Sequence, residues 1–311
     1  MTNSKKATLL VLFMILNQFV LSFFWVFITD IFHIGYETNF IFSEVLMFIF
    51  PLTIYFLITK ENIIETLNIR PLRLINIPII IALGIFIQPF MSFLSAISTL
   101  IFPNDVAALM GETMEVNIIY LIIGIGIFPA ICEELFFRGA VFSGFNNTNI
   151  FKASIMTGLY FGIMHLNGQQ FLYAFALGIF FCFLVYKTKS IFSSMLMHFV
   201  INTSQLLFAR LSFSQLSKTE ILQSLSDSTI YESLLTAAMT FILFCITLPL
   251  LAGLIWLFLY VNKSEYNPYF NPPKYLEEKV LNIPFVIIIV IYIIFAIIPP
   301  IIMTFINNSL I

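Results

Sequence analysis

The sequence predicts an all-α membrane protein, a polytopic helix bundle of about nine (eight to nine) transmembrane helices. Of its 311 residues, 60% are hydrophobic and only 10% are charged, whereas an ordinary soluble domain has about 25% charged residues. The apolar residues are gathered into long runs, and about 20 mainly apolar residues are enough for one helix across a bilayer. Because backbone polar groups that face lipid need partners within the protein, these runs are expected to be helical.

The first apolar run follows Lys5 and Lys6 and has no small-residue cleavage site, so we expect a retained helix and not a signal peptide. The later runs are similar in length and are separated by short polar stretches. The nine expected helices are residues 8–29, 40–59, 74–102, 117–137, 151–166, 171–186, 191–208, 236–261 and 281–306.

Three connecting stretches mix polar and apolar residues. Residues 103–116 and 209–235, both expected outside, are either plain connections or amphipathic segments on the membrane surface. Residues 61–73, expected on the cytoplasmic side, suit an interfacial helix ended by Pro71. The chain then divides into a membrane bundle (1–208), an extracytoplasmic loop (209–235) and a C-terminal two-helix membrane extension (236–311).

The basic residues predict the orientation, because Lys and Arg accumulate in cytoplasmic loops. With the N-terminus inside, twelve of the 14 Lys and Arg residues fall on the cytoplasmic side, and only Arg210 and Lys218 fall outside. We therefore expect a multi-pass protein of the plasma membrane with a cytoplasmic N-terminus and an extracytoplasmic C-terminus. The lipid bilayer is its expected surrounding.

Composition excludes two classes of site. The net charge is -2 and no dense Lys/Arg run is present, so a nucleic-acid partner is not expected. Cys132, Cys182 and Cys245 lie in apolar stretches without metal-ligand spacing, which indicates neither a disulfide framework nor a zinc ribbon.

Ionisable side chains at membrane depth are few, and each is a candidate functional residue because placing a charge in lipid is costly. Glu133 and Glu134 lie near the inner end of the fourth expected helix. His165 and His198 lie in the fifth and seventh expected helices. Glu44 lies near the outer end of the second, where it can reach water, so we do not place it in the site.

Helical spacing relates these residues to one another. Residues i and i+4 share a face, so Glu134 can pair with Arg138, while Glu133 points about 100° away. His198 and Asn202 have the same spacing. Each group alone would equally suit an interhelical hydrogen bond worth about 1 kcal/mol. If the polar faces converge, they form a cavity able to activate water and to stabilise an oxyanion, which is hydrolase chemistry.

Three motifs in order resemble the CAAX-protease and bacteriocin-processing family (CPBP, or Abi) of intramembrane proteases. They are EExxxR at residues 133–138, FxxxH at 161–165 and HxxxN at 198–202, all inside expected membrane helices. The matching region is about 117–208. The resemblance implies a protease core there, within the bundle of residues 1–208.

The resemblance further implies an intramembrane endopeptidase that forms no covalent enzyme intermediate. Its substrate would be a membrane-associated peptide or protein, in this family a prenylated CAAX protein, a bacteriocin or a similar peptide. Glu133 with His165 would activate the attacking water, and His198 with Asn202 would stabilise the oxyanion. The residues implied in supporting roles are Glu134 and Arg138.

The cofactor is either absent or Zn²⁺. Glu133, His165 and His198 could supply three zinc ligands and leave a position for water. Catalysis by glutamate without metal is the alternative.

Other mechanisms and classes were weighed on residue types. The three aspartates fall in expected loops, and neither HExxH nor GxSxG occurs, so aspartyl, zinc-helix and serine peptidases are excluded. A non-catalytic membrane scaffold, or an immunity or partner-binding protein of the same fold, is the alternative function. A transporter is less favoured because the sequence shows no related halves.

Overall fold

The computed structural model describes residues 2–214, 219–221, 223, 229–263 and 278–302. Within these ranges every regular element is a helix, so the predicted all-α class is confirmed. Seven of the described helices are long and apolar enough to cross a membrane, and Ile150–Met164 is a shorter apolar helix. Each of the nine expected spans coincides with helical structure in its described part. The expected span 191–208 coincides with a helix that contains several polar residues and is not among the seven.

Most elements are α-helices, and short π-helical stretches, which are labelled η, lie between some of them. Those of the first part are α1 (Asn3–Phe32), α2 (Tyr36–Glu44), η1 (Val45–Ile49), α3 (Phe50–Thr59), α4 (Ile63–Thr66), α5 (Asn76–Phe86), α6 (Gln88–Ser98) and α7 (Asp105–Glu112). Those of the second part are α8 (Ile118–Leu121), η2 (Ile122–Ile127), α9 (Phe128–Glu134), η3 (Leu135–Val141), α10 (Ile150–Met164), α11 (Gly168–Thr188), α12 (Phe192–Ser212), α14 (Ile230–Val261), α15 (Ile283–Tyr292) and η6 (Ile293–Ile297).

Several expected boundaries were wrong. The first helix is longer than 8–29, and the expected helix 74–102 is divided at Ile87, because Pro89 lacks an N–H and begins a new helix. In 61–73 only the short α4 is helical, and it ends before Pro71. Residues 103–116 do contain a helix, α7. Parts of the expected loop 209–235, and the last expected residues 303–306, lie outside the described residues.

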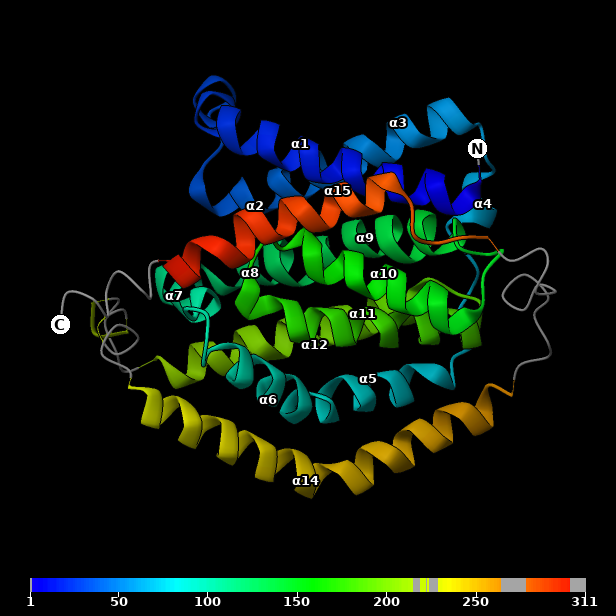
Figure 1. Cartoon of the computed structure of the whole chain (residues 1–311). Helices are drawn as coiled ribbons and strands as arrows, with labels where there is room; N and C mark the ends of the chain where they lie inside the picture. The colour runs from blue at the N-terminus through cyan, green and yellow to red at the C-terminus, as the bar shows by residue number, and fades with distance from the viewer. Residues whose placement is uncertain (1, 215–218, 222, 224–228, 264–277, 303–311) are drawn as a thin grey trace.

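The helices pack in layers around the segment that carries the motifs (Figure 1). α10 and α11 form the closest pair, and α12 packs on α9 and η2. The two C-terminal helices cover different faces: α14 packs on α5 and α6, whereas α15 packs on α1. The expected extension 236–311 therefore contributes one helix to each side of the core in its described part.

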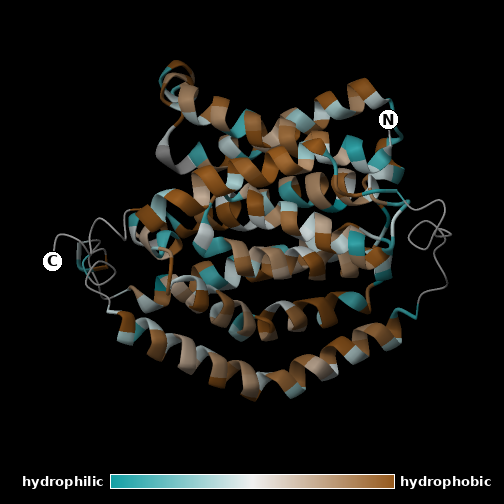
Figure 2. Ribbon diagram, viewed as in Figure 1, coloured by the Kyte–Doolittle hydropathy of each residue, from teal (hydrophilic) through white to brown (hydrophobic). Residues whose placement is uncertain are grey.

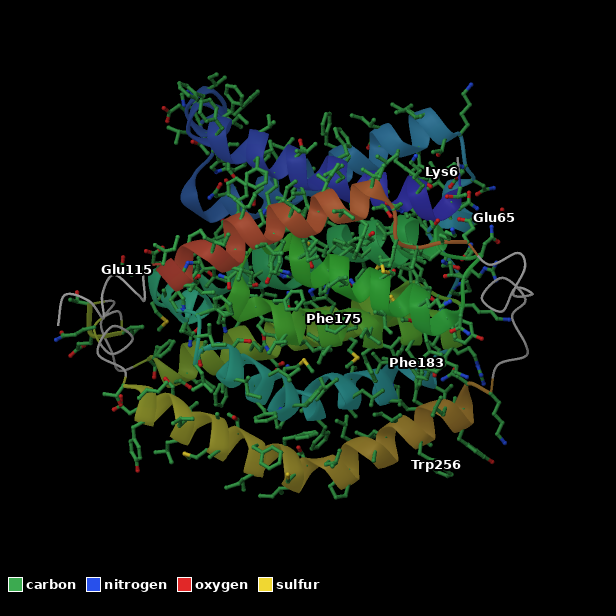
Figure 3. All side chains as sticks on the ribbon, viewed as in Figure 1. Lys6, Glu65, Glu115, Phe175, Phe183 and Trp256 are labelled. Atoms are coloured by element: carbon green, nitrogen blue, oxygen red, sulfur yellow. The ribbon has the colours of Figure 1, made fainter. Side chains whose placement is uncertain are left out.

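The flanks of the bundle are apolar, as the lipid-facing surface of a membrane protein must be. Figure 2 shows hydrophobic residues along the outer faces and hydrophilic residues concentrated toward the ends of the helices. On α14, Trp256 is 65% exposed and points away from the bundle (Figure 3). Exposed apolar surface of this extent is not tolerated in water, so the chain is an integral membrane protein.

The loops fall into two groups at opposite ends of the bundle. Lys6 Nζ contacts Glu61 Oε1 at 3.1 Å, and the Ser4 N–H donates to Glu278 Oε2 at 2.9 Å. At the opposite end, the Arg210 guanidinium donates to the Val116 carbonyl at 3.1 Å. Figure 3 shows Lys6 and Glu65 at the first end and Glu115 at the second. We call these the inner end and the outer end, following the predicted orientation.

Candidate active site

Glu133 and Glu134 lie where α9 passes into the π-helical stretch η3. Pro129 begins α9 directly after another π-helical stretch, η2. A π-helical turn holds an extra residue, widens the helix and is frequent at functional sites. Both carboxylates are buried, with exposures of 7% for Glu133 and 0% for Glu134. The local chain geometry therefore carries two acids into the protein interior.

A chain of three charged or polar groups begins at Arg138. Its Nη1 donates to Glu134 Oε1 at 3.0 Å, so the ion pair expected from the i,i+4 spacing is present. The same oxygen lies 2.9 Å from Nδ1 of His198. Since a carboxylate only accepts hydrogen bonds, this ring nitrogen carries the proton. Glu134 therefore fixes the orientation of the imidazole and connects η3 to α12.

Aromatic rings surround the charge of Arg138. The guanidinium carbon lies 4.1 Å from the ring centre of Phe161, 4.8 Å from that of Phe181 and 6.0 Å from that of Phe137. The side chain is fully buried. A cation over an aromatic face is attracted by the ring quadrupole. The rings therefore stabilise the part of the Arg138 charge that the carboxylate of Glu134 does not neutralise.

Glu133 faces the other nitrogen of the same imidazole. Its Oε2 lies 3.8 Å from His198 Nε2, too far for a direct hydrogen bond. One water beside both atoms could reach each at about 2.8 Å. The two carboxylates thus lie on opposite sides of the His198 ring. Glu134 is hydrogen-bonded to Nδ1, and Glu133 lies at a distance from Nε2 that suits a shared water.

His165 is positioned by its own helix. It caps α10, and its Nδ1 hydrogen-bonds to the Phe161 carbonyl at 2.9 Å. The two rings meet edge to face at 5.4 Å between centres, and Phe161 meets His198 in the same manner at 6.0 Å. Phe161 therefore lies between the imidazoles. Among the described residues, the imidazole paired with Glu133 is His198, whereas the motif resemblance implied His165.

Asn202 lies one helical turn beyond His198 on α12. Its Nδ2 donates to the Ile125 carbonyl in η2 at 3.0 Å. A π-helical stretch has weaker internal hydrogen bonding, so a side-chain donor stabilises it from outside. One of the two amide N–H groups is used in this contact, and the other remains for a ligand.

Two residues near the site were not predicted. Phe181 is fully buried against Arg138, and its ring centre lies 5.4 Å from that of His198 in a tilted arrangement. Glu44, set aside as interfacial, interacts electrostatically with Glu133, and its Oε2 is buried without a hydrogen-bond partner in the described structure. The sequence could have indicated Glu44, because it is an acid inside an expected membrane helix. Nothing in the sequence distinguishes Phe181 from the other phenylalanines, of which there are 38 in all.

The described residues do not form a metal site. No three His, Cys, Asp or Glu side chains in the described chain lie together as metal ligands. Glu133, His165 and His198, the set expected for zinc, are not gathered around one point in the described structure. The residues present therefore do not fit the metal, and no step is derived through it.

Fold and site together define a helical membrane protein with a buried carboxylate and imidazole cluster. A family model described as type II CAAX prenyl endopeptidase Rce1-like matches residues 115–204, a segment that contains all three motifs. The resemblance to the CAAX type of intramembrane protease is therefore confirmed over this segment.

One curated relative was found. The protein of Bacillus subtilis (strain 168) named "Putative membrane peptidase YdiL" is 34% identical to the chain over 84 residues. The matched stretch is 27% of this chain and 34% of that protein, so the similarity spans about a third of the relative. No solved structure matches the chain.

Proposed function

We propose that the protein is an intramembrane endopeptidase that hydrolyses a peptide bond of a membrane-associated peptide or protein. One observation carries the proposal: Glu133 and His198 face each other at 3.8 Å inside the bundle, with the second nitrogen of His198 fixed by Glu134. A carboxylate and an oriented imidazole around one water are the groups that hydrolysis requires. The matched family segment supports the same reaction class.

The proposed reaction consumes one water for each peptide bond. Glu133 accepts a proton from the water as its oxygen bonds to the carbonyl carbon of the substrate. The resulting oxyanion receives a hydrogen bond from the free N–H of Asn202 and one from Nε2 of His198, which donates there only when the imidazole is protonated on both nitrogens. Glu133 then delivers the proton to the leaving nitrogen, the C–N bond breaks, and an acid and an amine are released. For His165, which Phe161 separates from His198, a part in activating the water is what the motif resemblance implies.

Glu134 and Arg138 are proposed as positioning residues. Glu134 accepts the Nδ1–H of His198 and so fixes the orientation of the imidazole, and Arg138 holds the Glu134 carboxylate in place by the ion pair at 3.0 Å. Neither needs to touch the substrate in this scheme.

The central experiment compares membranes that contain the wild-type protein with membranes that contain Glu133→Gln. Glutamine keeps the size of the side chain but cannot accept the proton, so we expect processing to fall by at least about a hundred-fold. Peptidomics of the two membranes measures this loss and identifies the substrate. Glu65→Gln, an exposed acid at the inner end, is the matched control.

Full processing by Glu133→Gln at unchanged protein level would indicate the alternative function, a non-catalytic scaffold or an immunity or partner-binding protein. Chelation of the purified protein tests the cofactor separately. Since the described residues do not gather metal ligands, we expect activity to persist. Loss of activity that added Zn²⁺ restores would assign a metallopeptidase instead.

We also propose that the inner end is cytoplasmic. The inner-end loops carry most of the basic residues, which are retained on the cytoplasmic side. Single cysteines introduced as Glu65→Cys and Glu115→Cys, with the native cysteines replaced, test this orientation in intact cells. A membrane-impermeant maleimide should label Glu115→Cys and spare Glu65→Cys. The reverse pattern would invert the topology.

A further inference from the structure

A hollow opens at the outer end of the bundle, at the chain segment that directly follows His165. Its volume is about 710 Å³, within the range of about 300–1,000 Å³ typical of ligand sites. Three parts of the chain line it: the end of α6 with the following turn, the connection between α10 and α11, and the last described turns of the C-terminal helix. The lining residue Leu166 directly follows His165. The hollow is therefore one residue from the site along the chain.

The short α10 explains why the hollow exists. Its 15 residues span about 22 Å at about 1.5 Å per residue, less than the hydrocarbon core of about 30 Å. The connection that follows is therefore recessed below the outer surface. The other sides of the hollow are formed by the end of α6 with the following turn and by the C-terminal helix.

The recessed connection exposes backbone polar groups to the hollow. Leu166 has a φ of 46°, which is the left-handed region that disfavours a side chain such as leucine. In the described structure the N–H groups of Asn167 and Gly168 donate to no protein acceptor. Non-helical backbone at membrane depth occurs where it lines a wet cavity or a ligand. These donors suit the carbonyl groups of an extended peptide.

One ionisable side chain, Asp105 at the start of α7, lines the hollow. Its Oδ2 accepts a hydrogen bond from the Asn167 amide at 2.7 Å, and no described cation pairs with it. The described outer end is acidic in general, since it carries exposed acids such as Asp105, Glu112 and Glu115, while Arg210 donates to backbone carbonyls. The charge at the hollow is thus negative and uncompensated.

We propose that this hollow binds an extended, apolar substrate segment that carries a Lys or Arg side chain. The cation of the substrate would lie at Asp105, and the substrate chain would continue past Leu166, so that its scissile peptide bond is directed toward the site. The inference rests on the proposed peptidase function and adds the charge and the entry side of the substrate. Apolar residues at the hollow, among them Phe102, Phe295 and Pro299, match the apolar part of such a segment. A negative charge and free N–H donors together favour a cationic peptide over an acyl chain, which offers neither partner, and the competition with phosphatidylethanolamine described below tests a lipid headgroup.

Binding is measured apart from catalysis, on purified Glu133→Gln protein in detergent micelles. The probes are two apolar peptides of about ten residues that differ only in bearing two lysines or two glutamates. We expect the lysine peptide to bind about ten-fold more tightly, and Asp105→Lys to remove or reverse this preference. Asp105→Asn should give an intermediate result. Glu115→Lys adds the same charge change at an exposed acid of the outer end outside the hollow and should keep the preference.

Each outcome decides the inference. Equal binding of both peptides would overturn the proposed preference for a cation. Equal effects of Asp105→Lys and Glu115→Lys would also overturn it, because they would show that only the general surface charge matters. Competition by phosphatidylethanolamine vesicles as effective as the lysine peptide would assign the hollow to lipid and overturn it too. Unfolding temperatures of the variants show that each is folded. If Glu133→Gln does not affect processing while the charge preference holds, the peptidase proposal fails and the binding site stands.

Discussion

Arg138 shows how a charge is tolerated deep in a membrane protein. The side chain is fully buried, one carboxylate pairs with it, and aromatic rings cover it. Taking a charge out of water is costly, and the cost is offset only when the pairing is complete. Nε and Nη2 have no hydrogen-bond partner in the described structure, so the rings and Glu134 together carry this compensation.

Replacing Arg138 should therefore destabilise the protein as well as inactivate it. Arg138→Leu leaves Glu134 buried without its cation, and we expect a loss of roughly 3–5 kcal/mol. Thermal unfolding in detergent measures the change. Arg73→Leu is the control, because this arginine is exposed and its contact among the described residues is a hydrogen bond to the Val261 carbonyl. An unfolding temperature as high as that of the control would show that the ion pair is dispensable for the fold.

At the scale of elements, α10 and α11 approach each other most closely through two glycines. A Cβ built on Gly178 would lie 2.5 Å from the Gly158 Cα, well inside van der Waals contact. Small residues at helix interfaces allow such approach, and in lipid this packing replaces the hydrophobic driving force. Because α10 carries His165 and α11 carries Phe181, the glycine contact also determines how two walls of the site meet.

Enlarging the glycine should separate these helices. We expect Gly178→Leu to destabilise the protein by at least about 1–3 kcal/mol, the usual range for overpacking. Gly253→Leu on α14 is the matched control, because no atom lies within 4 Å of a Cβ built there. Protein level in membranes and unfolding temperature should fall for the first variant alone. Equal behaviour of the two would contradict the close contact.

At the scale of the whole molecule, the N-terminus of α1 is joined to the segment before α15. The Ser4 N–H and the Asn147 amide donate to Glu278, and the Ser4 hydroxyl donates to the Lys279 carbonyl at 3.1 Å. Asn147 and Glu278 lie at the inner end outside the candidate membrane spans, and Ser4 lies in the first turn of α1. They connect helices that are first and last in the described chain across a sequence separation of 274 residues.

The Glu278 contacts predict a pH dependence. Partial burial alone would raise the pKa of Glu278, but hydrogen bonds from Ser4 and Asn147 outweigh it and hold the pKa below its ordinary value of 4.5. A depressed pKa contributes stability that is present above the unfolded value and is lost as the pH falls through the folded one. Hydrogen exchange in the first turns of α1 should therefore accelerate on acidification below about pH 4.5.

Glu278→Gln is the control for this prediction. Because the amide does not titrate in this range, the exchange rate, corrected for its intrinsic pH dependence, should be nearly constant across the same interval. An equally large acid response in the variant would assign the effect to another group.

The sequence by itself determined the all-α class and the approximate places of the helices, because a long apolar run in lipid must satisfy its backbone polar groups internally. It also determined the Glu134 and Arg138 pair, since i and i+4 share a face whatever surrounds the helix. Only the tertiary structure decided that His198 faces Glu133, that Phe181 covers Arg138 and that Glu44 approaches the site. These relations depend on how each helix is rotated and tilted against its neighbours, and packing between residues distant in the chain sets both.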